Sequence, residues 1–292
     1  MIAAGHPFDW HLHLFWLLAL LGLAAGYLWT TRQPANVASA RQKVLFFCGL
    51  ALLAAALTWP LGDLASHWLL LALVLQRLLL TLAVPPLLVL GTPRPVIARL
   101  TRPAAVDAVL RVAVRPAPAV AIVTVVAVGT LTVGAVNLAA QSPAALVAIQ
   151  LLVLASGFVL WAPVLTELPG AQHLSALGRG GYLIVQSIVP SFLSIVWIFA
   201  RHPLYSAFTH KGTVVGMTPL LDQELAGFLA KLSTIAVLWT VAFVIMTRAQ
   251  ADETSGRDVD PLVWSDVERE IERADRRDRR QGWPGSPPPG SF

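Results

Sequence analysis

Seven long apolar runs constrain this 292-residue chain more than any other feature of its sequence. A helix that crosses the hydrocarbon core of a bilayer needs roughly 20 apolar residues, and each run approaches or reaches that length. Charged residues make up only 13% of the chain, against about 25% in soluble domains, which excludes an ordinary soluble enzyme. The runs predict transmembrane helices at 10–30, 44–62, 67–90, 119–139, 144–163, 182–200 and 225–247.

The end of the chain has a different composition. Residues 248–292 hold 8 of the 21 Lys and Arg and 10 of the 16 Asp and Glu. We therefore predict a transmembrane domain at 1–247 and a cytoplasmic tail at 248–292. Within the tail, Ser265 to Glu268 forms a capping-box pattern that starts a short amphipathic helix, and the Pro- and Gly-rich segment from Gln281 onward is expected to be disordered.

Positive charge is concentrated in alternate connections between the runs, which sets the expected orientation. The connections at 31–43, 91–118 and 164–181 carry most of the Lys and Arg outside the tail, and the other three carry only Arg201 and Lys211. The sequence thus predicts an all-α polytopic bundle of seven helices in the plasma membrane, with the N-terminus outside and the C-terminus cytoplasmic. The basic excess reflects topology and gives no reason to expect nucleic-acid binding.

Histidines gather at the predicted outer ends of the helices. Six of the seven histidines fall there, together with several carboxylates. Imidazole and carboxylate ligands suit Cu(II) and Zn, so a metal site is one interpretation. The alternative for each histidine is hydrogen bonding to water and lipid headgroups, and Asp222 has the further alternative of capping the last helix. The candidate ligands are His11, His13, His67, His202, His210, Asp63 and Asp222.

Two cations lie inside predicted spans, where an ionisable residue suggests a function. Arg77 falls near the middle of the third run with Gln76 beside it, and we expect it to face the bundle interior. Lys231 in the seventh run is close enough to the end to extend its amine toward the interface. A seventh-helix lysine is also found in microbial rhodopsins, but the aspartate expected one turn earlier is Gly227 here, and the third run has no acidic counter-ion.

Several segments together resemble the CtaG-type cytochrome c oxidase assembly factors. Their order and spacing fit that family over about residues 8–247. The resemblance implies seven helices and a non-enzymatic role in maturing haem–copper oxidase, with copper delivered on the extracytoplasmic side and oxidase subunits and membrane lipid as partners. The segments are Leu75 to Pro93 with its Pro-Pro-Leu-Leu sequence, Leu160 to Leu165, Pro203-Leu204-Tyr205, and Leu221 to Gly227.

The sequence departs from the family pattern at two places, and the first removes the copper site that the resemblance implies in the third helix. The family's histidine pair corresponds to Leu73 and Arg77, and its Met-Trp pair to Ala230 and Lys231. Arginine cannot ligate copper, so any metal would be bound at the outer ends. Two alternatives remain open: a transporter or channel whose path is lined by Arg77 and Lys231, and a scaffold that binds respiratory subunits without metal.

Overall fold

Helices make up all the regular structure of the residues that the computed structural model describes, which are 13–165, 168, 174–209 and 216–254. The chain divides into units 1–245 and 246–292, and the account below concerns the first. In order the helices are α1 Leu14–Thr31, η1 Pro34–Asn36, α2 Ala40–Leu57, α3 Leu61–His67, α4 Leu70–Leu78, η2 Leu79–Ala83, α5 Val84–Gly91, α6 Arg94–Leu100, α7 Ala104–Ala113, α8 Pro116–Thr130, α9 Val133–Gln141, α10 Pro143–Trp161, α11 Ala176–Phe199, α12 Ser206–Thr209 and α13 Pro219–Thr254.

Length and composition identify the membrane-crossing helices. In the described part of the chain six helical segments are long and apolar enough to cross a membrane, and a seventh is added if α7 and α8, bent by 101°, count as one span. The prediction of an all-α polytopic membrane protein is confirmed. The orientation of the termini stays a prediction, and the proposed tail helix from Ser265 lies outside the described residues.

The fourth apolar run forms two helices where the sequence predicts one. α8 ends at Thr130, and α9 begins after Thr132, whose hydroxyl accepts the N–H of Ala135. Threonine favours such N-cap positions because its side chain satisfies a free backbone donor. This cap, with glycines on both sides at 129 and 134, explains why the apolar run does not continue as one helix.

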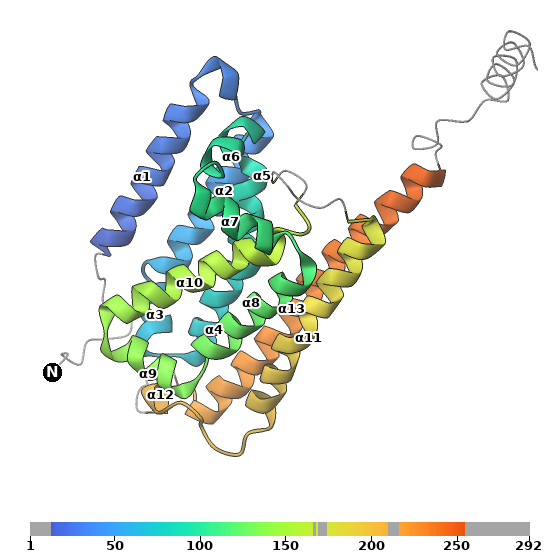
Figure 1. The fold of residues 1–292 in the computed structure, drawn as a ribbon. Coiled ribbons are helices and arrows are strands. Elements are labelled where there is room, and N and C mark those ends of the chain that lie inside the picture. The colour runs from blue at the N-terminus through green and yellow to red at the C-terminus, as the bar shows by residue number, and fades with distance from the viewer. Residues whose placement is uncertain (1–12, 166–167, 169–173, 210–215, 255–292) are drawn as a thin grey trace, which may run out of the picture. The chain divides into compact units, whose positions relative to one another are not determined.

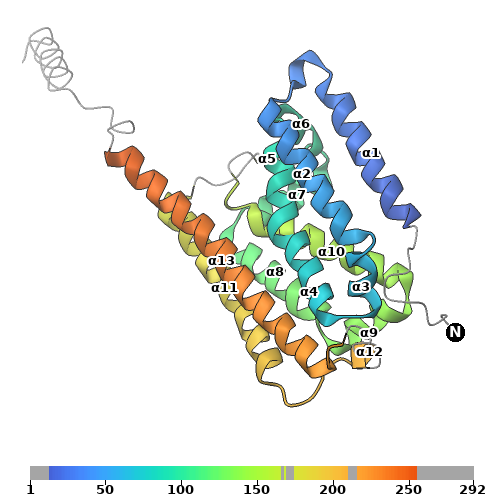
Figure 2. The same ribbon diagram turned by 180° about the vertical axis from the view of Figure 1, so that it is seen from behind.

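The core of the unit lies on both sides of α10. In Figure 1, α1, α2 and α5 lie on one side of α10 and the long pair α11 and α13 on the other, and Figure 2 shows the same order from behind. One buried cluster joins Phe46, Leu53 and Val84 from α2 and α5. Another joins Trp161 to Leu183 and Leu238 from α11 and α13. Apolar side chains therefore hold α10 between two helical layers.

The two prolines of the third apolar run predict irregular last turns, but the change of helical geometry falls in the middle of the run. The segment η2 is π-helical and leads directly into Pro85 and Pro86. Proline has no N–H, so Pro85 leaves the carbonyl of Thr81 without its usual partner. The indole Nε1 of Trp161 donates to that carbonyl at 3.0 Å. Gly157 permits the close approach, because a Cβ there would lie 2.7 Å from the Leu80 carbonyl oxygen.

We expect Trp161→Phe to lower the free energy of unfolding by about 1–3 kcal/mol, because it keeps the aromatic packing but leaves a buried carbonyl unpaired. The midpoint of thermal unfolding of the detergent-solubilised protein measures the effect. Trp239→Phe is the control, since its indole donates at 3.1 Å to the Ser187 hydroxyl, a group that also bonds the Ile184 carbonyl. An equal or larger loss in the control would contradict the role given to Trp161.

Candidate functional site

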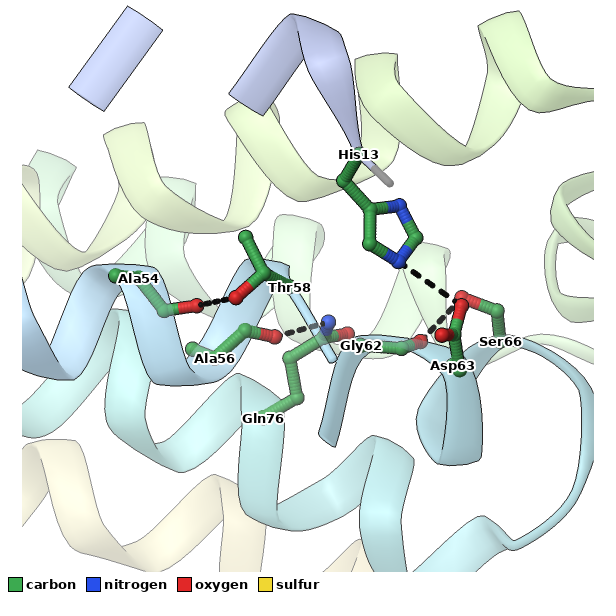
Figure 3. A network of polar contacts seen from close by, with 8 residues as sticks. All are labelled: His13, Ala54, Ala56, Thr58, Gly62, Asp63, Ser66 and Gln76. Atoms are coloured by element: carbon green, nitrogen blue, oxygen red, sulfur yellow. Dashed lines mark hydrogen bonds and ion pairs between the residues drawn. The ribbon is translucent and has the colours of Figure 1, made fainter. Parts of the chain in front are cut away.

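One end of α1 is joined to α3 by a histidine–carboxylate pair. The Nε2 atom of His13, the residue just before α1, lies 3.0 Å from Oδ1 of Asp63, and the two side chains are 26% and 12% exposed. Figure 3 shows the imidazole pointing from the start of α1 toward α3. His13 also lines a cavity of about 190 Å³, together with Ser66 and Gln150. Two of the predicted metal-ligating side chains thus meet in space.

Among the described residues, the other candidate ligands do not complete a metal site with this pair. His202 is exposed on the connection after α11, and His67 is the last residue of α3. His11 and His210 lie outside the described residues. Within residues 13–165, 168, 174–209 and 216–254 no group of three His, Cys, Asp or Glu side chains is placed to hold a metal ion. The metal site therefore stays a prediction, with His13 and Asp63 as its described core.

Asp222 performs a different task from capping its own helix. Its carboxylate accepts the backbone N–H groups of Leu70 at 2.7 Å and Leu71 at 3.0 Å, and the residue is only 1% exposed. These N–H groups open α4 and have no partner within that helix. A carboxylate at this position also opposes the positive end of the helix dipole. Asp222, near the start of α13, therefore caps α4.

The residues beside Asp222 connect further helix ends. The Gln223 side chain accepts the N–H of Leu204 at 2.8 Å and donates to the carbonyl of Trp197 at 3.3 Å. The Tyr205 hydroxyl donates to the carbonyl of Leu131, just beyond α8, at 2.7 Å. Burial raises the pKa of this hydroxyl, and the hydrogen bond from Trp197 opposes that shift, so Tyr205 remains a donor at neutral pH. These contacts connect the Leu221–Gly227 segment to Pro203-Leu204-Tyr205.

Gln76 and Arg77 likewise satisfy the ends of other helices. Gln76 donates to the Ala56 carbonyl in the last turn of α2 at 2.7 Å (Figure 3). Arg77 donates from Nη1 to the Thr130 hydroxyl and from Nη2 to the Thr130 carbonyl, the latter at 3.0 Å. A cation is favourable at the C-terminus of a helix. The expectation that Arg77 faces the interior is confirmed, and Thr130 is a partner that no sequence pattern indicated.

Lys231 does not share the environment of Arg77. It is half-buried on α13, whereas Arg77 lines two cavities between the helices. The transporter or channel alternative stays a prediction.

The fold and this set of buried polar contacts define a polytopic helical membrane protein whose buried polar side chains join helix ends. A family model for the cytochrome c oxidase caa3 assembly factor (CtaG) matches residues 13–251, and the chain belongs to this family. The resemblance noted from the sequence is therefore confirmed. A search of curated proteins and a search of solved structures gave no match.

Proposed function

We propose that this protein promotes the assembly of cytochrome c oxidase by binding copper at the His13–Asp63 end of the bundle and presenting it to an oxidase subunit. The observation that carries the proposal is the pairing of His13 with Asp63 at 3.0 Å, from two different helices. Membership of the assembly-factor family supports cytochrome c oxidase as the partner. The charge pattern of the connections supports placing this end on the extracytoplasmic side of the plasma membrane.

The chemistry of the pair supports copper as cargo. Imidazole and carboxylate both suit Cu(II), and imidazole also serves Cu(I). Two donors leave the coordination incomplete, so further ligands must come from elsewhere. His11, two residues before His13 in the sequence, is the candidate third donor, and the receiving oxidase subunit is the other source. The role requires no catalytic residue, which fits an assembly factor that is not an enzyme.

Copper loading tests the proposal directly. The full-length protein in detergent is loaded with Cu(I) and Cu(II) separately, and bound metal is measured after desalting. We expect about one copper per chain, lost in both His13→Ala and Asp63→Ala because each removes a ligand. Asp107→Ala is the control, since Asp107 pairs with Arg111 at 2.6 Å on α7. Copper retained by both site variants would contradict the site.

A cellular measurement separates the copper step from the assembly role. We expect a strain lacking this protein to accumulate less assembled oxidase, with less copper per oxidase, and the His13→Ala protein to restore neither. Full restoration by that variant would limit the protein to a scaffold for oxidase subunits. Normal, copper-replete oxidase in the deletion strain would contradict both parts of the proposal.

A further inference from the structure

A cavity of about 100 Å³ lies between α4, η2, α8, α10, α11 and α13. The described residues that line it are mostly apolar, and one of them, Arg77, is charged. Buried charges in proteins are normally paired, and inside a membrane an isolated cation is more costly still. The charge of Arg77 therefore lies beside this cavity, in the interior of the helical bundle.

The guanidinium of Arg77 has an unused donor. Its two terminal nitrogens bond Thr130, whereas Nε is buried and has no hydrogen-bond partner. No carboxylate of the described residues forms an ion pair with Arg77. Bonding to Thr130 satisfies part of the donor capacity but adds no negative charge. Among the described residues, Arg77 therefore has neither a counter-charge nor an acceptor for its Nε–H.

Gln186 provides a second unsatisfied group in the lining. It is 2% exposed, and its Oε1 atom is buried with no partner. The oxygen and nitrogen of a side-chain amide exchange places by a half-turn, so Gln186 can present its NH₂ group to the cavity instead. Arg77 and Gln186 together then offer donors from α4 and α11 to one ligand.

We propose that this cavity binds one small monovalent anion through Nε of Arg77 and the amide of Gln186. One positive charge is neutralised by one negative charge. A water-sized group needs roughly 10–15 Å³ of such space, so the volume admits a halide or a short carboxylate with some water but excludes a long acyl chain. The bound anion neutralises Arg77 where it joins α4 to α8. This site is independent of the proposed copper site.

Anion exchange at constant ionic strength tests the site. The full-length protein is purified in potassium gluconate, whose anion exceeds the cavity, and is titrated with potassium chloride or potassium formate. Equilibrium dialysis with labelled chloride should show saturable binding of about one ion per chain, and saturating chloride should raise the thermal midpoint by about 5 °C. Formate that competes with chloride identifies the monoanion class, and failure of formate restricts the site to halides.

Matched variants assign the binding. Arg77→Gln should abolish the chloride-dependent rise in the thermal midpoint, whereas Lys231→Gln, which removes the other intramembrane cation, should keep it. If Arg77→Gln fails to fold, Gln186→Leu, which removes an unsatisfied polar group, should fold and weaken chloride binding at least tenfold. The absence of saturable chloride binding to the unaltered protein would overturn the proposal, as would unchanged affinity in Arg77→Gln or, when that variant cannot be measured, in Gln186→Leu.

Discussion

Replacing Gly91 by alanine should reduce the free energy of unfolding by about 3 kcal/mol, through a clash that the fold has no room to relieve. A Cβ at this position would collide with the backbone nitrogen of Phe46 and lie 2.7 Å from its Cα. The Gly91 carbonyl also accepts the Tyr27 hydroxyl at 2.9 Å, and the Tyr27 ring stacks on Phe46. Separating α5 from α2 would therefore also disturb the attachment of α1.

The measurement is the midpoint of thermal unfolding, with the yield of monodisperse protein as a second readout. Gly129→Ala is the matched control, because a Cβ there meets no atom within 4 Å. That substitution lies within α8 and should leave stability unchanged or raise it by about 0.4–1 kcal/mol. Equal midpoints for the two variants would show that α2 and α5 are not in close contact at Gly91.

Asp222→Ala should lower the free energy of unfolding by about 2–5 kcal/mol. The substitution leaves the buried N–H of Leu70 and the part-buried N–H of Leu71 without acceptors. Each unsatisfied buried donor costs about 1–3 kcal/mol. Asp222→Asn keeps one acceptor oxygen and should recover about half of the loss. Thermal unfolding of the three proteins side by side gives the comparison.

Glu224→Ala serves as the control for this prediction. Glu224 is an acidic residue two positions along the same helix and is half-buried. Its carboxylate forms no hydrogen bond with a described residue of α4. Its removal should change the free energy of unfolding by about 0.5 kcal/mol or less. If Asp222→Ala were as mild as Glu224→Ala, the carboxylate would not be the group that stabilises the start of α4.

Most of the membrane fold could be predicted from the sequence, because hydropathy over some 20 residues records a simple requirement of the bilayer. Pro85 and Pro86 indicated irregular last turns in the third run, but the π-helical segment lies before them and Val84–Gly91 is α-helical. The break between Thr130 and Thr132 was missed, since hydropathy does not register a threonine cap inside an apolar run. A cap depends on a single side chain, and its contribution to stability depends on which backbone groups the surrounding helices leave without hydrogen-bond partners.

The candidate site was only partly predictable. The residue types at the membrane ends suggested metal ligands, but spacing along one helix could not show that His13 meets Asp63 across two helices. The Asp222 carboxylate fits the pattern of a cap, although the capped helix is α4, which begins 152 residues earlier. No sequence pattern indicated that Thr130 binds Arg77, because the two residues meet only where Arg77 reaches the end of α8.

The segment from Leu70 to Ala83 depends on parts of the chain that the ribosome makes much later. Its first N–H groups form hydrogen bonds with Asp222, and the Thr81 carbonyl accepts one from Trp161, 80 residues further along. Hydrocarbon offers these groups no substitute partner. During synthesis the third membrane segment must therefore stay in contact with water, the insertion machinery or a chaperone until α10 and then α13 emerge. The last hydrogen bonds of this segment can form only after α13 has been made.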